Sequence, residues 1–325
     1  MKKKIVAFGE VMMRLAPPMY TTLQQAQTFD FMFTGTGVNV LAGLYGLGFE
    51  TTLLTALPDN NVGYAAASHL RRLGIKDSYI DFSGNHLGSY VIEFGAGARS
   101  SQVTYLNRTE SSFAKANYQL ENWESVVANA DMLHICGISL INENTYNTAL
   151  RLMDIAKDHH VPVVFDSNFR PSLWQDDRMH LYKEMYEAML KRADIVFAGP
   201  RDVVKLLGID GDSATLMQDF QKHYALEYVL GTERFEQSIQ GFIVSNDAYN
   251  VSDRYPLTII DRIGGGDGFA VGALTGILEG MAPEDIVAYG VASGVLAHTV
   301  YGDAVLVNRI DIENLIQGVK IDLKR

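Results

Sequence analysis

The sequence predicts an α/β protein with a doubly wound, mostly parallel sheet, helices on both faces of that sheet and a small β lid. Short, continuous apolar runs alternate with helical patterns along most of the chain. Strands with such unbroken apolar runs are typical of parallel sheets that helices cover on both sides. Two polar and aromatic segments interrupt the alternation, and these predict the lid.

The expected elements follow one another in alternating order. Each candidate strand is short and rich in β-branched or aromatic residues, and helical periodicity appears between the strands. The strands are KIVAFG (4–9), TTLLTAL (51–57), MLHICGIS (132–139), VPVVFDSN (161–168), ADIVFAG (193–199), EYVLGT (227–232), GFIVS (241–245) and PLTIID (256–261). The helices are expected at 38–47, 62–73, 144–159, 179–192, 214–224 and 268–278. Because ligands of such sheets bind beyond the carboxyl ends of the strands, polar residues at strand ends are candidate site residues.

The two interruptions span residues 12–33 and 87–112. Within the second, YVIEF (90–94) and SQVTYL (101–106) alternate polar and apolar residues, as half-exposed strands do. Both segments carry aromatic residues and arginine, which favours one small antiparallel flap over the sheet edge; two unrelated surface hairpins are the alternative. We expect a single domain over residues 1–325 in which these two excursions form the lid.

The composition is that of an ordinary globular protein, and its charge narrows the classes of partner. The chain has 325 residues, of which 47% are hydrophobic and 20% are charged, and its net charge is −11. Such an acidic balance argues against nucleic acid or an anionic membrane as the main partner. It also means that an anionic substrate must meet a local group of arginines.

Cysteine use and the length of the apolar runs indicate the compartment. Cys136 is the only cysteine, which excludes an internal disulfide and fits a reducing compartment. It lies in a strand-like run, so we expect a small buried residue rather than a nucleophile. No apolar run approaches the ~18 residues of a membrane span, and the run after MKKK is too short for the core of a signal peptide. We expect a soluble cytoplasmic protein.

The stretch DRIGGGDGFAVG (261–272) carries the main chemical signal. It lies between a predicted strand and an apolar helix, so the glycines Gly264, Gly265 and Gly266 are expected to form a strand-to-helix turn. Backbone N–H groups at such a turn, with the positive end of the helix dipole, form an anion site. Asp267 follows at once, where its carboxylate could take the proton of an attacking hydroxyl while the N–H groups hold a transferring phosphoryl group.

Taken alone, this stretch also fits an ordinary capped helix. Aspartate is a good N-cap residue, and glycine is common in turns. The stretch is not a Walker P-loop, because no Gly-Lys-Ser/Thr follows the glycines. The choice between the two interpretations depends on the other motifs of the chain.

Several such motifs occur in the order found in one family. DRIGGGDGFAVG resembles the C-terminal signature of the ribokinase family of sugar kinases, in the form typical of 2-keto-3-deoxygluconate kinases. Four further stretches resemble, in chain order, the family's opening strand and lid entry, its N-terminal sugar motif, a stretch found in ketodeoxygluconate kinases, and the segment after the signature: AFGEVMMRLAPP (7–18), GTGVNVLAGLYGLG (35–48), FDSNFRPSLW (165–174) and AHTVYGDAVLV (297–307). The resemblance covers essentially the whole chain and implies a ribokinase-like fold.

The resemblance implies a role for each matching residue. Asp267 is implied to be the base that takes the proton from the sugar hydroxyl, and the three glycines before it to form the anion hole around the γ-phosphate of ATP. The residues implied to contact the sugar are Gly35, Asn39, Tyr90, Tyr105, Arg108, Arg170 and Asp303. The residues implied to contact the nucleotide are Asn168, Gly231, Thr232 and Glu233, together with Gly264 and Gly266.

Arg170 is the residue expected to select an acid as substrate. It follows a predicted strand, where ligands of this architecture lie, and a guanidinium can hold a carboxylate through two hydrogen bonds. A surface arginine, or a contact with the nucleotide phosphates near Asn168, is the alternative. Arg108 is the second candidate, and it lies one residue later than the family's Tyr-x-Arg spacing from Tyr105.

For two of the implied sugar contacts, the sequence leaves a structural role equally open. Asn39 opens a predicted helix after a glycine-rich turn, so it could simply cap that helix. Asp303 lies in YGDA, where capping a turn is the alternative to contacting the substrate.

Some positions depart from the family's pattern, mostly on the nucleotide side. Thr34 replaces the first glycine of the sugar motif, and Gly268 replaces the usual Ser or Ala after the base. Gly199 replaces the Asn of an Asn-x-x-Glu motif, in which Asp202 keeps the acid. The nucleotide stretch Lys-x-Gly-x-x-Gly appears as GTERFE (231–236), without its second glycine.

We therefore expect an ATP-dependent kinase that converts a sugar acid, foremost 2-keto-3-deoxygluconate, to its 6-phosphate. Mg²⁺ is expected to arrive with ATP and to keep mainly water and phosphate ligands, without a metal site built from protein ligands. We expect small-molecule partners only, and a homodimer formed through the lid. Two alternatives remain open: a kinase of a neutral ketose or a nucleoside, and a sugar-acid-binding protein with weakened ATP use.

Overall fold

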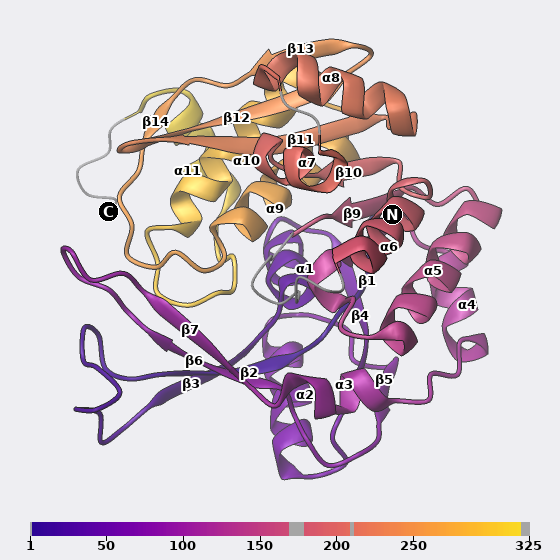
Figure 1. Cartoon of the computed structure of the whole chain (residues 1–325), viewed down its shortest axis with the longest axis vertical. Coiled ribbons are helices and arrows are strands. Elements are labelled where there is room, and N and C mark those ends of the chain that lie inside the picture. The colour runs from indigo at the N-terminus through magenta and orange to yellow at the C-terminus, as the bar shows by residue number, and fades with distance from the viewer. Residues whose placement is uncertain (1, 169–178, 209–210, 320–325) are drawn as a thin grey trace.

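A large mixed sheet forms the centre of the molecule (Figure 1). The computed structural model describes residues 2–168, 179–208 and 211–319. In this part of the chain the sheet has ten strands in the order β13-β12-β11-β10-β9-β8-β1-β4-β5, with β14 paired to β12. The strands are β1 (Lys4–Phe8), β4 (Glu50–Leu57), β5 (Ile80–Phe82), β8 (Met132–Cys136), β9 (Val163–Asp166), β10 (Ile195–Phe197), β11 (Tyr228–Phe235), β12 (Ser238–Ser245), β13 (Ala248–Val251) and β14 (Tyr255–Pro256).

The pairing confirms the predicted mostly parallel sheet. All neighbouring pairs from β5 to β11 are parallel, and only the pairs that involve β12 are antiparallel. The parallel pairs need crossover connections, which the helices between these strands provide. The chain therefore winds outward in both directions from β1 and β8, and the strand ends that meet there are the expected place for a ligand.

Helices cover both faces of this sheet. Successive residues of β1 point to opposite faces: Ile5 and Ala7 belong to one apolar core, and Val6 and Phe8 to the other. One core is closed mainly by α1, α2, α9 and α10, and the other by α4, α5, α6 and α8. The helices are α1 (Thr36–Gly46), α2 (Asn61–Arg72), α3 (Ser112–Lys115), α4 (Glu121–Ala128), α5 (Glu143–Asp158), α6 (Met179–Leu190), α7 (Pro200–Leu207), α8 (Ser213–Tyr224), α9 (Gly265–Glu279), α10 (Pro283–Ala297) and α11 (Arg309–Ile316).

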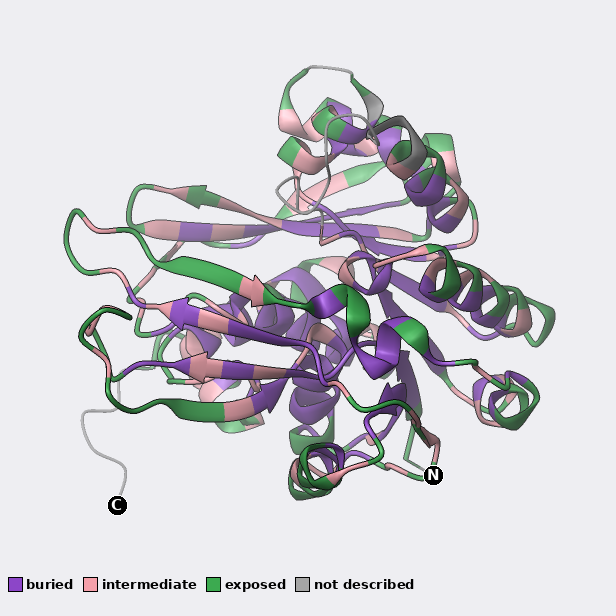
Figure 2. Ribbon diagram, turned by 60° about the horizontal axis from the view of Figure 1, so that its bottom comes forward, coloured by how far each residue is buried: buried purple, intermediate pink, exposed green. Residues whose placement is uncertain are grey.

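The strands of the two interrupting segments pair into a second sheet, which we call the lid sheet. Its strands are β2 (Met12–Ala16), β3 (Asp30–Thr34), β6 (Ser89–Glu93) and β7 (Gln102–Leu106), in the order β3-β2-β6-β7. The two segments meet through the pair β2–β6, so they are not separate hairpins. Because this central pair is parallel, the lid sheet is mixed, and the predicted purely antiparallel flap is wrong in this respect. Figure 1 shows the lid sheet projecting to one side of the main body. Its inner strands are largely buried, whereas the outer strand β7 is mostly exposed and the outer strand β3 is exposed at its start and buried at its end (Figure 2).

One predicted strand is wrong. The stretch PLTIID does not form a strand; pairing ends at Tyr255–Pro256, and an irregular segment leads into α9. Its backbone bonds to other partners, because the N–H groups of Ile260 and Asp261 donate to the carbonyl oxygen of His298 at 2.8 and 3.4 Å. The segment just before the glycine turn is therefore hydrogen-bonded to the C-terminal end of α10 rather than to a sheet strand.

The helices α9 and α10 are among the most apolar of the described helices, and they pack against each other within the core. They contribute Phe269, Val271, Leu274, Ile286 and Val287 to the larger apolar cluster. Among the helices that the structure describes, none combines the length and the apolar character that a bilayer crossing would need.

Candidate active site

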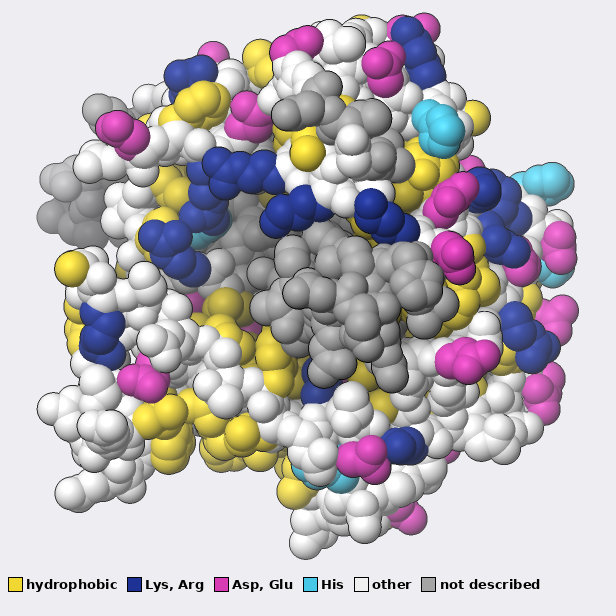
Figure 3. Space-filling view, in the orientation of Figure 1, with side chains coloured by type: hydrophobic (Ala, Val, Ile, Leu, Met, Phe, Trp, Pro, Cys, Tyr) yellow, Lys and Arg dark blue, Asp and Glu magenta, His cyan; other side chains and the backbone are white. Residues whose placement is uncertain are grey.

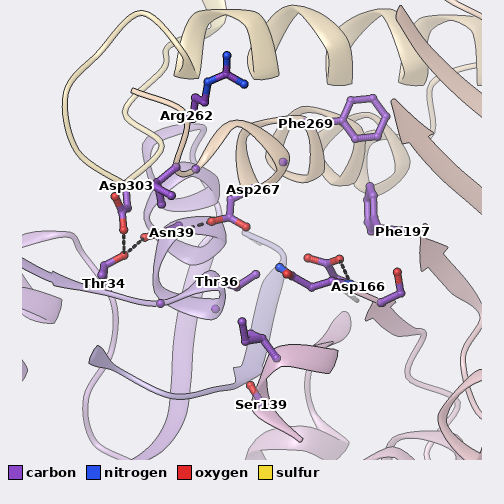
Figure 4. Close-up of a pocket in the computed structure, with 18 of the residues that line it drawn as sticks. Thr34, Thr36, Asn39, Ser139, Asp166, Phe197, Arg262, Asp267, Phe269 and Asp303 are labelled. Carbon is purple, nitrogen blue, oxygen red and sulfur yellow. Dashed lines mark hydrogen bonds between the residues drawn. The ribbon is translucent and has the colours of Figure 1, made fainter. Parts of the chain in front are cut away.

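A cavity of about 850 Å³ lies between the lid sheet and the carboxyl ends of the main-sheet strands. Main-sheet residues that line it include Asp166 at the end of β9, Phe197 at the end of β10, and Leu230 of β11. The lid contributes Met12, Tyr90, Val103 and Tyr105, and the first turns of α1 and α9 contribute Asn39 and Asp267. Figure 4 shows Asn39 and Asp267 next to each other, joined by a hydrogen bond.

Asp267 lies in the first turn of α9, and its side chain is held by Asn39. The Nδ2 group of Asn39 donates a hydrogen bond to Oδ2 of Asp267 at 2.7 Å. Neither residue is the N-cap of its own helix, because Gly35 occupies that position in α1 and Gly264 in α9. Asp267 is only 8% exposed, and what remains exposed faces the cavity. The arrangement is therefore that of an oriented carboxylate in a pocket, not of a surface cap.

The three glycines of the turn serve different purposes. Gly264 has a φ of 85°, and a Cβ there would lie 2.6 Å from the carbonyl oxygen of Asp303. A Cβ on Gly265 would lie 2.0 Å from the ring of His298, whereas one on Gly266 would meet nothing within 4 Å. Gly264 and Gly266 line the cavity and Gly265 does not. The turn thus brings bare backbone and the positive end of α9 to the open space beside Asp267.

A continuous series of hydrogen bonds leads from Asp267 to the lid (Figure 4). The hydroxyl of Thr34 lies 3.1 Å from Oδ1 of Asn39 and 2.8 Å from Oδ2 of Asp303. The hydroxyl of Tyr90 donates to the same Asp303 oxygen at 2.5 Å, and burial raises the pKa of Tyr90, which keeps it a donor. Thr34, which departs from the family's glycine, is therefore part of the polar network around Asp267.

Asp303 lines the cavity, but its carboxylate is taken up by protein groups. Its Oδ2 receives Thr34 and Tyr90, and its Oδ1 receives Nη1 of Arg14. Asp303 is 2% exposed. Its contribution to a substrate site is therefore mainly to hold the lid strand and Thr34 in place.

Arg14 was not identified from the sequence and is completely buried. Besides Asp303, its guanidinium donates to Oδ2 of Asp261 at 2.6 Å, and it lies 5.3 Å from the ring centres of both Phe94 and Tyr301. Its position was detectable, because Arg14 shares the inward-facing register of β2 with Met12 and Ala16. A cation in that register indicates a buried partner.

Tyr105 and Arg108 both reach the cavity in spite of the extra residue between them. The chain turns at Asn107, whose φ of 46° is left-handed, directly after β7. Arg108 then lies 5.6 Å from the ring centre of Tyr105 and donates through Nε to Oε2 of Glu10 at 2.5 Å and through Nη2 to the carbonyl of Ile138 at 2.7 Å. Sequence reasoning missed Glu10, although it is an acid directly after the first strand.

The other end of the cavity holds the residues assigned to the nucleotide. Asn168, Gly231 and Thr232 line it, but Glu233 does not. Arg170 lies outside the described residues. Three arginines that the sequence reasoning did not single out also line this end: Arg201, Arg234 and Arg262. Figure 3 shows Lys and Arg side chains gathered along one rim of the hollow on this face of the molecule.

The acids of the cavity do not gather into a metal site. In the described part of the chain no three His, Cys, Asp or Glu side chains are placed to hold one ion. Asp202 lines the cavity, and its carboxylate accepts the N–H of Gly199 at 3.2 Å, closing the first turn of α7. Cys136 is buried, and burial raises the pKa of its thiol well above the usual range, as expected for a packing residue.

An oriented carboxylate at the start of α9, a glycine turn open to the cavity and a lid sheet beside a doubly wound sheet together define a ribokinase-like sugar kinase. The chain belongs to the pfkB family of carbohydrate kinases, whose family model matches residues 2–308.

Similar proteins of this family carry more specific names. A solved structure from Enterococcus faecalis, provisionally described as a 2-keto-3-deoxygluconate kinase, is 39% identical and covers 100% of this chain and 99% of its own, with a TM-score of 0.95. The structure of 2-dehydro-3-deoxygluconokinase from Thermotoga maritima is 30% identical over 98% of this chain and 99% of its own, with a TM-score of 0.91. A 2-dehydro-3-deoxygalactonokinase from Haloferax volcanii is 27% identical over 98% of both chains.

Proposed function

We propose that this kinase transfers the γ-phosphoryl group of ATP to the 6-hydroxyl of a 2-keto-3-deoxy sugar acid, foremost 2-keto-3-deoxygluconate. The observation that carries the proposal is the hydrogen bond from Asn39 to Asp267 beside the glycine turn. It holds a carboxylate at the one point of the cavity where a proton acceptor and bare backbone N–H groups meet. The names of the similar proteins support a ketodeoxy sugar acid, but they include both the gluconate and the galactonate epimer.

In the proposed reaction Asp267 accepts the proton of the sugar hydroxyl. The freed oxygen forms a bond to the γ-phosphorus while the bond from that phosphorus to the ADP oxygen breaks. The N–H groups at the start of α9 stabilise the charge on the transferring group, and the open space at Gly266 leaves room for its oxygens. Mg²⁺, carried in by ATP, neutralises phosphate charge when bound; Asp202 is the cavity acid on the nucleotide side that fits an outer contact to it.

The acid group of the substrate needs a cation that is not already neutralised. Arg108 is paired with Glu10, which is 4% exposed, so the two together bring no net charge to the cavity. The resemblance of FDSNFRPSLW to the ketodeoxygluconate kinase stretch implies Arg170 for this role, so we assign the substrate carboxylate first to Arg170, with Arg108 supporting it through its remaining donors. Tyr90 and Tyr105 line the same side of the cavity and provide flat walls for the sugar acid.

The assignment of Arg170 has a direct test. Losing a charge-assisted contact typically weakens binding about 10- to 100-fold, so Arg170→Ala should raise the KM for the sugar acid by that factor and leave the KM for ATP unchanged. Arg170→Lys should recover only part of the loss, because an ammonium cannot pair bidentately. Arg151→Ala, on the exposed side of α5, is the matched control. A defect confined to ATP would remove Arg170 from the sugar site.

The function itself is tested by a coupled assay of ATP consumption across a panel of substrates. We expect turnover with 2-keto-3-deoxygluconate or its galactonate epimer, and much lower turnover with neutral ketoses and nucleosides. A preference for a neutral ketose would contradict the proposal that the substrate is a sugar acid. Binding of a sugar acid without turnover would favour a binding protein, the alternative that Gly199 and the GTERFE stretch motivate.

We further propose a homodimer that forms through the lid sheet. The face of that sheet that points away from the cavity carries two exposed large apolar residues, Phe31 of β3 and Leu106 of β7, which are 62% and 40% exposed. Sedimentation should give the mass of a dimer for the wild type and of a monomer for the double variant Phe31→Asp, Leu106→Asp. Val251→Asp, an exposed apolar position on β13, is the control. A monomeric wild type would contradict this arrangement.

A further inference from the structure

Three arginines surround the nucleotide end of the cavity, and none of them has a carboxylate partner among the residues that the structure describes. Arg201 lies in the first turn of α7, Arg234 on β11, and Arg262 just before the glycine turn. Within the described part of the chain, none of the three forms an ion pair with a carboxylate. In a chain with a net charge of −11, three unneutralised cations at one end of one cavity indicate a place for an anion.

Arg234 is held in position by a buried histidine. Its Nη2 group donates to Nε2 of His298 at 2.8 Å, while Nδ1 of His298 lies 2.7 Å from the carbonyl oxygen of Gly294. The carbonyl can only accept, so Nδ1 carries the proton and Nε2 is the acceptor for Arg234. The pKa of His298 is lowered, chiefly by burial, which keeps the ring in this neutral form.

The same histidine ring supports the glycine turn. A Cβ on Gly265 would lie 2.0 Å from an atom of the His298 ring, so the ring packs directly against the backbone of that residue. The position of Arg234 is thereby linked to the position of the turn that receives the transferring phosphoryl group. Figure 4 shows Arg262 on the other side of the turn, above Asp267.

Two of these arginines also act on each other. Burial and the nearby charge of Arg262 both lower the pKa of Arg234. Like charges placed together cost free energy unless an anion binds between them. Guanidinium groups bind phosphate oxygens bidentately, and they do so better than ammonium groups.

We infer that Arg201, Arg234 and Arg262 bind the polyphosphate chain of the phosphoryl donor, with His298 as the positioning residue for Arg234. The start of α9 receives the terminal phosphoryl group, and the arginines hold the phosphates behind it. This inference rests on the proposed kinase function. It names a polyphosphate anion as the ligand, and that anion comes either from a nucleoside triphosphate or from inorganic polyphosphate.

The kinetic test separates the donor from the sugar. Arg234→Ala and Arg262→Ala should each raise the KM for ATP about tenfold, and the double variant by more, while the KM for the sugar acid stays at its wild-type value. The KM for ATP should also rise less steeply with salt in the double variant, because fewer exposed charges remain to be screened. Arg254→Ala is the matched control: this arginine lies 3.7 Å above the ring of Phe235, outside the cavity. Variants of Arg234 and Arg262 that behave like Arg254→Ala would overturn the inference.

A binding measurement identifies the ligand without turnover. Calorimetry with inorganic tripolyphosphate should show binding to the wild type that ATP displaces, and at least tenfold weaker binding to the double variant. Equal binding to both proteins would overturn the inference even if the kinase assay succeeds, and failure of that assay alone would affect only the proposed function. Turnover with tripolyphosphate and no nucleotide would identify inorganic polyphosphate as the source; turnover with ATP alone would identify the nucleotide.

The role of His298 is tested by a double-variant cycle. His298→Gln should raise the KM for ATP in the wild-type background and cause little further rise in Arg234→Ala, because the arginine that it positions is gone. A purely structural role would add equally in both backgrounds. Should His298→Gln fail to fold, Arg234→Lys tests the same bond, since it keeps the charge and should recover only part of the KM.

Discussion

Asn39 of α1 donates a hydrogen bond of 2.7 Å to Asp267 of α9, which lies 228 residues further along the chain. The bond joins the starts of two helices that pack together at the edge of the cavity. It orients the Asp267 carboxylate beside the glycine turn, where the proposed reaction places the sugar hydroxyl for in-line transfer. Four predictions follow from this arrangement and from the buried groups around it.

Asp267→Asn should keep the fold and lose most of the turnover. A lost general base typically lowers the rate about 10²- to 10⁴-fold, and the amide is isosteric with the carboxylate. Turnover of the purified variant and its thermal midpoint are the measurements. Asp253→Asn, an exposed acid outside the cavity, is the control. Near wild-type turnover in Asp267→Asn would mean that this residue is not the base.

Two neighbouring glycines should respond in opposite ways to the same methyl group. Gly266→Ala has room for its Cβ and should leave stability equal or higher by up to about 1 kcal/mol, yet lower turnover about 10²-fold by occupying the anion space. Gly265→Ala drives its Cβ against the ring of His298 and should destabilise the fold by about 1–3 kcal/mol or more. Urea unfolding measures the stability of both variants, and the kinase assay measures their turnover. An active, stable Gly265→Ala would contradict the packing described here.

Arg14→Met should destabilise the protein strongly. The substitution leaves Asp261 and Asp303 buried without their cation, and breaking a buried pair in this way typically costs about 3–5 kcal/mol. Arg71→Met removes an exposed pair with Asp77 and should cost about 1 kcal/mol or less. The free energy of unfolding in urea measures both. Equal losses in the two variants would show that the buried pair contributes no more than the surface pair.

His134 should make the protein acid-sensitive. The residue is fully buried on β8, both ring nitrogens lack a partner among the described residues, and burial lowers its pKa from 6.5 to about 4. The unfolded chain therefore binds a proton at a higher pH than the folded chain. Stability falls as the pH drops below 6.5 and levels off near pH 4, with a total loss of about 3 kcal/mol.

His134→Leu removes the titrating group from a buried apolar surrounding. Between pH 6.5 and pH 4 the wild type should lose about 3 kcal/mol of unfolding free energy through His134, and the His134→Leu variant should not show this loss. His159→Gln, at the exposed end of α5, should keep the wild-type dependence. A steep pH dependence that persists in His134→Leu would assign it to other groups.

The sequence predicted those parts of the fold that depend on local pattern. The apolar runs that became β1, β4, β8, β9, β10, β11 and β12 were identified because a strand buried on both faces carries its own signal. PLTIID is as apolar and β-branched as those strands, yet its backbone hydrogen-bonds to His298 instead of to a neighbouring strand. No local sequence pattern indicates this alternative partner. The alternating runs of the lid predicted β6 and β7, but not the pairing of β6 with β2.

The sequence could predict a site residue where its neighbours along the chain indicate its role. Asp267 follows its glycines directly, so sequence alone could place it. Arg14 is 247 residues from Asp261 and 289 residues from Asp303 in the sequence, so only the folded chain brings them together. His298, the partner of Arg234, lies 64 residues further along the chain. Thr34 was classed as a departure, because its two partners are visible only in three dimensions.

The position of Arg14 and Tyr90 decides how the lid sheet can move. The two residues are directly opposite each other in the β2–β6 pair, and both are fastened to Asp303 in the main body. These contacts fix the position of the lid sheet along the line through Arg14 and Tyr90, and leave the strand ends beyond that line free of them. Opening and closing must therefore come from bending of the strands beyond this line, toward Ala16, Glu93 and the loops that join the strands, and not from rotation of the whole sheet about its root.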